Sequence, residues 1–130
     1  MSNIESVDGI KYLAYLEEVN LTQNAVSQAN FSGLQCLRSV NLSWNPIDTL
    51  NLNDCPALED LSLADSNGSL KTLEFSENPK MRSLDIRNSG ITRLNLRTAP
   101  LLRQTALYGK ITDESGEPKV PGTPSYYNRY

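Results

Sequence analysis

Apolar residues recur along this chain with a period of about 21 residues. Four six-residue segments carry an apolar residue at their first, fourth and sixth positions, and a fifth is degenerate because Thr105 fills its fourth position. The segments begin at Leu16, Leu37, Leu58, Met81 and Leu102, in steps of 21, 21, 23 and 21 residues. Alternation at the fourth and sixth positions is typical of a strand that buries one side. The pattern predicts strands near residues 18–22, 39–43, 60–64, 83–87 and 104–108.

A second apolar group follows each of the first four segments, and it alternates again, as in Ile47, Leu50 and Leu52. We call each unit of about 21 residues a coil and count its positions from the first apolar residue. A coil of this length leaves little room for a helix, so we expect extended or short β segments in its second half. One coil cannot bury its leucines alone, whereas stacked coils close a continuous core and pair their strands in a parallel sheet. The predicted fold is a β-rich solenoid with few or no helices.

Position nine is polar in the first four coils, where it holds Asn24, Asn45, Ser66 and Ser89. An Asn at this position offers amide donors and a carbonyl to the backbone groups of a turn, so we predict a structural role for it. The residues predicted to build the repeat framework are Leu37, Val40, Leu42, Asn45, Leu58, Leu61, Leu63, Leu84 and Ile86.

These residues give the chain its resemblance to leucine-rich repeat proteins. The pattern L-x-x-L-x-L-x-x-N reads directly from Leu37 to Asn45, and a proline stands near the end of three coils. Together with the second apolar group, the pattern is similar to the short bacterial type of internalin-like and other surface repeat proteins. The resemblance covers about residues 4–110. It implies a right-handed leucine-rich repeat superhelix with a parallel β-sheet on the concave face, and a secreted or cell-surface location.

We expect three parts along the chain. Residues 1–15 form an N-terminal cap or half repeat, residues 16–111 form five leucine-rich repeats, and residues 112–130 form a C-terminal tail or linker. The tail contains Pro118-Lys-Val-Pro121, so it either packs on the last coil or offers a proline-rich ligand motif.

Composition narrows the classes of function. The chain has 130 residues, no His and two Cys, which removes the commonest general base and most zinc sites. No run approaches the roughly 18 apolar residues of a membrane span. A net charge of -3 is unlike the basic domain of a nucleic-acid binder. We therefore predict no enzymatic activity, catalytic residue, metal ligand or cofactor, and neither a membrane span nor a nucleic-acid partner.

The cellular compartment stays open at this stage. Cys36 and Cys55 either form one bridge in an oxidising compartment or remain free thiols. Met1-Ser2-Asn3 leads into Ile4 without the basic and apolar regions of a signal peptide, which fits a cytosolic chain or a mature one.

Charge varies along the chain and along position two. Residues 1–79 contain three basic and eleven acidic side chains, whereas residues 80–130 contain nine basic and four acidic ones. Position two reads Glu17, Arg38, Glu59, Arg82 and Arg103. Opposite charges on neighbouring strands either form a surface ladder that fixes stacking or contact a ligand.

Positions seven and eight contain the residue types that dominate binding hot spots. Trp44, Arg87 and Tyr108 stand there, and no apolar repeat position requires them. Trp44 is either a hot spot or a side chain that folds back on its own coil. The basic stretch from Lys80 to Lys110 is either a solvated face, a surface that steers an acidic partner, or one end of a charge dipole that favours head-to-tail self-association. The candidate partner-binding residues are Trp44, Arg82, Arg87, Arg103 and Tyr108.

The sequence thus favours a non-catalytic interaction module that binds a protein or a glycan through the concave strand face. The alternative is a structural spacer or capping segment of a larger repeat-containing surface protein. A homo-oligomer is compatible with the sequence but not indicated by it.

Overall fold

The structure is a computed structural model that describes residues 3–75, 78–91, 93–95, 106–110 and 128–129. In residues 74, 94–95, 106–110 and 128–129 the backbone alone is described. One 3-10 turn, η1 (Ile10–Tyr12), precedes the strands. The strands are β1 (Glu18–Asn20), β2 (Gln28–Asn30), β3 (Ser39–Asn41), β4 (Thr49–Asn51), β5 (Asp60–Ser62), β6 (Thr72–Glu74), β7 (Ser83–Asp85), β8 (Arg93–Asn95), β9 (Ala106–Lys110) and β10 (Asn128–Arg129).

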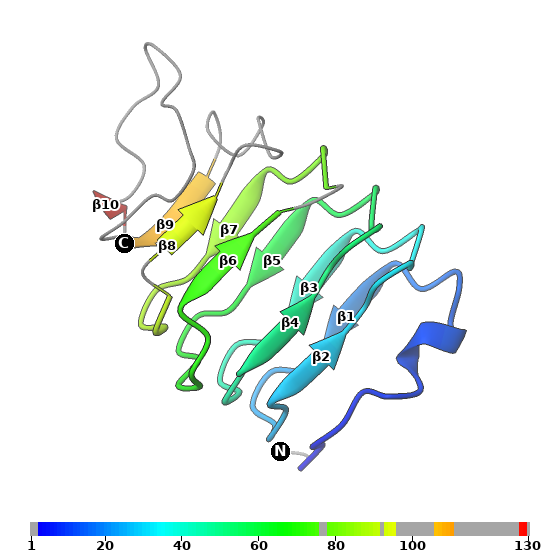
Figure 1. Ribbon diagram of the computed structural model, residues 1–130, viewed down its shortest axis with the longest axis horizontal. Helices are drawn as coiled ribbons and strands as arrows, with labels where there is room; N and C mark the ends of the chain where they lie inside the picture. Colours follow the sequence, from blue (N-terminus) through cyan, green and yellow to red (C-terminus); the bar gives the residue numbers. More distant parts are fainter. Residues whose placement is uncertain (1–2, 76–77, 92, 96–105, 111–127, 130) are drawn as a thin grey trace.

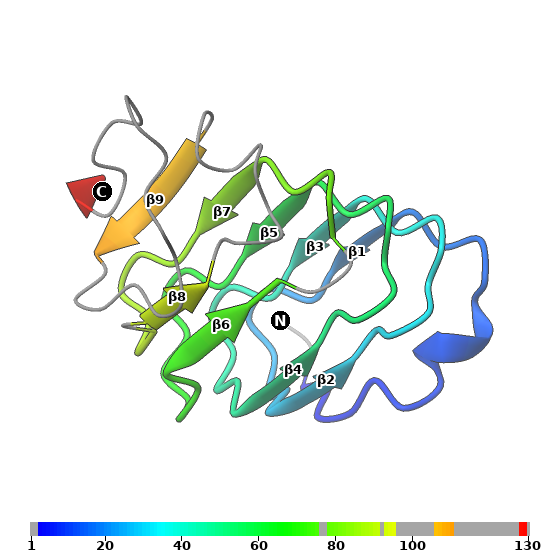
Figure 2. The same cartoon turned by 45° about the horizontal axis from the view of Figure 1, so that its top comes forward.

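The strands form two layers with the core between them (Figures 1 and 2). The first sheet has the order β1-β3-β5-β7-β9-β10, and its neighbours are parallel except for the antiparallel pair of β9 and β10. Its register places Val19 beside Val40, Val40 beside Leu61 and Leu61 beside Leu84. The second layer contains the parallel pairs β2–β4 and β6–β8. The predicted β-rich solenoid with parallel strands is confirmed.

The core follows the repeat pattern. Leucines at positions one and six of the inner coils are fully buried, and so are the residues at position four between them. The buried framework residues are Leu37, Val40, Leu42, Asn45, Leu58, Leu61, Leu63, Leu84 and Ile86.

The strands are shorter than predicted because the side chain of the last strand residue accepts a hydrogen bond from the backbone N–H two residues later. Asn41 ends β3, and its Oδ1 accepts a hydrogen bond from the Ser43 N–H at 3.0 Å. The following Trp44 has φ 61°, in the left-handed region, so the chain turns there instead of continuing the predicted strand 39–43. The same bond joins the backbone N–H of Thr22 to the side chain of Asn20, of Ser32 to Asn30, of Asn53 to Asn51, of Ala64 to Ser62 and of Arg87 to Asp85.

A left-handed residue stands three positions after each of these strand ends, at Gln23, Gly33, Asp54, Asp65 and Asn88. The first two coils therefore make the same turn twice, once after each of their strands, and the third and fourth coils make it after β5 and β7. This repeated turn limits the first-sheet strands before β9 to three residues, where five were predicted.

The third coil is two residues longer than its neighbours. The extra residues lie where the second layer divides into two pairs of strands. Gly68 packs so tightly that a Cβ on it would overlap the backbone of Ile47. Ser69 is held by Asp48, whose Oδ1 accepts hydrogen bonds from the Ser69 N–H at 2.8 Å and from its hydroxyl at 2.9 Å. Among the described strands, β4 pairs with β2 and β6 with β8.

The N-terminal segment docks on the first coil through its backbone. Ile4 N donates to Asn24 Oδ1 at 2.9 Å, and Ala25 N donates to Ile4 O at 2.8 Å. Val7 joins the core, whereas Ile4 and Leu13 are exposed. The expected domain boundaries stay predictions, and the proline motif of the tail lies outside the described residues.

Candidate functional site

Asn45, at position nine, bonds backbone groups of two coils. It is fully buried, and its Nδ2 donates to Leu21 O at 2.8 Å and Leu42 O at 3.0 Å. Its Oδ1 accepts from Val26 N at 3.0 Å. Ser66, at the same position of the next coil, also bonds the preceding coil but at a different carbonyl, because its hydroxyl donates to Asn45 O at 2.8 Å. These residues stabilise the stacking and are not available to a ligand.

Trp44 lies in the turn that borders the first sheet. Its side chain is 56% exposed, which favours an outward side chain over one packed back on its own coil. β3 ends at Asn41, so Trp44 lies three residues beyond the strand. Its backbone is in the left-handed region, and its N–H donates to Ala64 O of the next coil at 3.0 Å. Bulky residues are outliers in that conformation, so the fold gains nothing local from Trp here.

The equivalent turn residues of the neighbouring coils form a row with Trp44, which we call the turn ridge: Gln23, Trp44, Asp65 and Asn88. Asn88 Nδ2 donates to Asp65 Oδ1 at 3.1 Å across two coils. Position seven, beside the ridge, is not exposed in every coil. Ser43 is buried, with its hydroxyl 2.7 Å from the Ser62 hydroxyl.

Arg87 stands beside the ridge with its guanidinium held by Asp85. Nε donates to Asp85 Oδ1 at 2.9 Å and Nη2 to Asp85 Oδ2 at 2.6 Å. A carboxylate in this bidentate contact fixes the direction of the guanidinium. Arg87 is therefore exposed and oriented, but much of its charge is already balanced.

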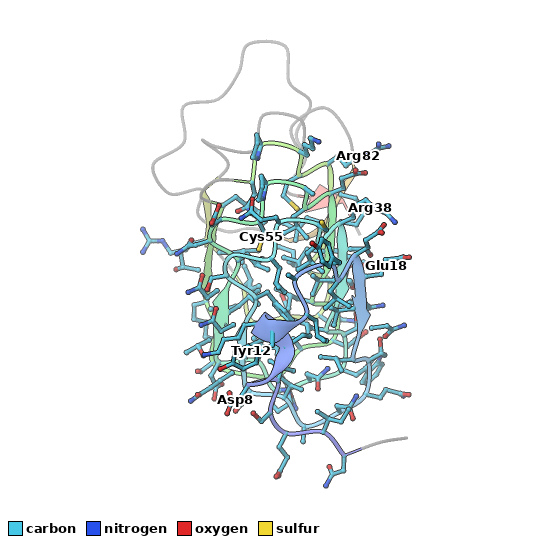
Figure 3. All side chains as sticks on the ribbon, turned by 90° about the vertical axis from the view of Figure 1, so that its right-hand side faces the viewer. Asp8, Tyr12, Glu18, Arg38, Cys55 and Arg82 are labelled. Atoms are coloured by element: carbon cyan, nitrogen blue, oxygen red, sulfur yellow. The ribbon has the colours of Figure 1, made fainter. Side chains whose placement is uncertain are left out.

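Position two forms the ion-pair ladder that was one of the two predicted outcomes. Arg38 Nη2 lies 3.5 Å from Glu17 Oε1 and 3.8 Å from Glu18 Oε2, and Arg82 Nη1 lies 4.0 Å from Glu59 Oε1. Glu18, Arg38 and Arg82 share one side of the molecule in Figure 3. Exposed pairs of this kind contribute about 0–1 kcal/mol each. The ladder aligns coils and leaves the ligand-contact alternative open.

The remaining candidates lie partly beyond what the structure describes. Arg103 is outside the described residues, and Tyr108 is in β9, where its side chain is not described. Arg93 opens β8 in the second layer, whereas Arg82 and Arg87 border the first sheet. The described arginines of the basic stretch are thus divided between the two layers.

Sequence reasoning missed the function of position five. Asn20, Asn41, Ser62 and Asp85 hold this position, and each ends a strand through its side chain. The signal was present, because every one of these residues is a small polar residue that favours turns.

Reactive chemistry is scarce in the described part. Cys36 and Cys55 are both free. Burial raises the pKa of the Cys55 thiol, which donates to Phe31 O at 3.1 Å, so it is a poor nucleophile at neutral pH. No group of three or more His, Cys, Asp or Glu is placed to hold a metal ion within the described ranges. A search of the same residues finds no helix of the length and apolarity needed to cross a membrane.

Shallow grooves lie at the N-terminal end and on the second layer. One of about 450 Å³ lies beside η1, and one of about 390 Å³ lies between β4 and β6. Asp8, Lys11 and Tyr12 are the ionisable side chains of the first, and the second is lined by Asn, Thr and Leu. Neither lining brings together an acid, a base and a nucleophile.

Comparison with known proteins finds a family model that matches part of the chain. The model of a family described as Leucine Rich repeat matches residues 33–50, which include β3 and most of β4. No curated protein and no solved structure matches the chain. The match and the parallel-stranded solenoid together support a leucine-rich repeat protein. Repeats of this kind generally mediate protein–protein interaction and are typically non-catalytic scaffolds.

Proposed function

We propose that this chain is a non-catalytic interaction module that binds a protein partner through the turn ridge, with Trp44 as its main contact. The supporting observation is that Trp44 is exposed in a left-handed conformation that disfavours Trp. A residue that costs the fold stability and fills no core position is typical of a functional surface. Trp is also the residue type most enriched in hot spots.

Arg82 and Arg87 flank β7 in the first sheet and add positive charge to its surface, part of which Glu59 and Asp85 balance. They set the rate of encounter with an acidic partner, while Trp44 and Tyr108 set the lifetime of the complex. Because the repeats are similar to the short bacterial type of surface repeat protein, the proposal includes a secreted or cell-surface location and an internalin-like arrangement of the repeats.

The test is a binding-kinetics experiment on a partner captured from host or neighbouring-cell lysate. Trp44→Ala should raise the dissociation rate, and the double reversal of Arg82 and Arg87 to Glu should lower the association rate and flatten its salt dependence. Tyr15→Ala is the matched control, because Tyr15 is an aromatic residue with 87% exposure on the N-terminal segment, away from the ridge. Unaltered kinetics in both Trp44→Ala and the double reversal would show that the partner binds elsewhere on the chain.

A further inference from the structure

Inner strands of the first sheet use the same two backbone groups to bind the coil before them. In β3, Ser39 N donates to Glu17 O at 3.1 Å, and Asn41 O accepts from Leu21 N at 2.9 Å. The N–H of the third position and the C=O of the fifth position therefore face the preceding coil. β5 and β7 repeat this arrangement, with donors Asp60 and Ser83 and acceptors Ser62 and Asp85.

In β1 the same two groups face an open edge. The register aligns Glu18 with Ser39 and Asn20 with Asn41, and among the described strands β1 pairs with β3 alone. The Glu18 N–H and the Asn20 C=O consequently point away from β3, along what we call the β1 edge. In Figure 3, which faces the N-terminal end, η1 stands over the middle of that end, and β1 lies to its side. An unpaired edge is a template for another strand.

The core beside the β1 edge is incompletely covered. Leu16 and Leu21 are only partly buried, whereas the equivalent Leu37 and Leu42 of the next coil are completely buried. Leu13 is 54% exposed on the same segment. An added strand with apolar residues at its fourth and sixth positions would cover Leu16 and Leu21 as each inner coil covers its neighbour.

Charge at the β1 edge indicates the chemistry of that strand. Residues 3–20 contain four carboxylates and one lysine, and two of the carboxylates, Glu17 and Glu18, lie at the edge. Arg38 contacts both on the β3 side and leaves one negative charge in excess. A parallel strand in the same register would place its second position beside Glu17. Two copies paired through β1 would instead bring their glutamates together, so the edge favours a basic partner over a second copy.

We propose that the β1 edge is a second interaction site, which takes an extended segment of a protein partner as a parallel strand. The segment has Lys or Arg at the position beside Glu17 and apolar residues two and four positions later. Main-chain hydrogen bonds supply affinity, and the side chains supply specificity. This site is separate from the turn ridge and does not require Trp44.

The test uses the 130-residue chain and two fluorescent peptides. The first peptide, LRSVNLS, copies residues 37–43, and the second, LESVNLS, replaces its Arg by Glu. Fluorescence anisotropy at low salt should show at least about tenfold tighter binding of the Arg peptide, since like charges at an interface oppose binding. Binding should slow hydrogen exchange at the Glu18 and Asn20 amides, and leave the Leu21 amide, already bonded to Asn41, unchanged.

Glu18→Pro is the decisive variant. Proline removes the edge N–H, and the fold should persist because that N–H does not bond to β3. Affinity for the Arg peptide should fall at least about tenfold, which corresponds to 1.4 kcal/mol. Glu18→Gln keeps the N–H and should lose only a few-fold, and circular dichroism and a denaturation curve verify that both variants are folded.

Equal binding of the two peptides, or full binding by folded Glu18→Pro, would overturn the proposal. So would a dimer that Glu18→Pro dissolves, because the edge would then be an interface between copies. Trp44→Ala should bind the Arg peptide with unchanged affinity. A failure at the β1 edge therefore leaves the proposed function of the turn ridge standing, and the reverse also holds.

Discussion

Asn45 shows how one buried side chain satisfies the backbone of two coils. Its amide bonds carbonyls of Leu21 and Leu42, and its oxygen bonds the Val26 N–H. Asn45→Ala should lower the free energy of unfolding by roughly 2–4 kcal/mol, because buried backbone groups lose their partners. Asn45→Ser should cost less, since Ser66 shows that a hydroxyl fits this position. Urea denaturation measures both, and equal midpoints for Asn45→Ala and the parent would contradict the structural role.

For Trp44 we predict the opposite effect on stability, because a substitution there should stabilise the fold. Its φ of 61° suits Asn far better than Trp, because Asn visits the left-handed region readily. Trp44→Asn should raise the free energy of unfolding by roughly 0.5–1 kcal/mol, a fraction of the strain that such a residue stores. Trp44→Ala keeps a Cβ without the polar side chain and should gain less. Thermal denaturation compares the three proteins, and a loss of stability in Trp44→Asn would mean that the indole packs on the scaffold.

The second half of the third coil shows how an insertion is accommodated between strands. Gly68→Ala should destabilise the fold by roughly 1–3 kcal/mol, because its Cβ overlaps the Ile47 backbone, which cannot move without disturbing β4. Gly9→Ala is the control. Gly9 has φ -82° and open space at its Cβ, so its substitution should be neutral within about 0.5 kcal/mol. If chemical denaturation shows equal losses of stability at the two glycines, Gly68 is not packed against the Ile47 backbone.

Hydrophobic periodicity predicts which side chains of each element are buried, since burial of Leu42 or Leu63 follows from alternation alone. It does not predict where a strand ends, because Asn41 stops β3 through a side-chain hydrogen bond that leaves the apolar pattern unchanged. The left-handed conformation of Trp44 was hidden for a similar reason. Trp is not a turn residue, and only its alignment with Asp65 and Asn88 identifies the turn.

The candidate site was predictable to a smaller extent than the fold. On the predicted strand 83–87, Asp85 and Arg87 share one side, so a contact between them could be expected from their spacing, although the structure forms it across the turn after β7. The β1 edge could not, because it depends on which coil lacks a neighbour in the assembled solenoid. That property belongs to the stacking of coils and has no signature within one repeat.

At the scale of the whole molecule, the two layers couple the coils unequally. The first sheet runs without a break from β1 to β10, whereas the second layer divides into the pairs β2–β4 and β6–β8. Neighbouring coils around the insertion are therefore joined mainly by the first sheet and by the core. In such an array, stability is close to a sum of coil and interface contributions.

The same truncation should consequently cost more inside the solenoid than at its N-terminal end. Leu63 is fully buried between two coils, so Leu63→Ala should cost roughly 2–5 kcal/mol through lost burial and a cavity. Leu21 occupies the same position in the first coil but is only partly buried, and Leu21→Ala should cost clearly less. Denaturation midpoints rank the two variants, and hydrogen exchange in the parent should be faster in β1 than in β5. Equal losses at Leu21 and Leu63 would mean that the first coil is covered as completely as the inner ones, and the open β1 edge would then not exist in solution.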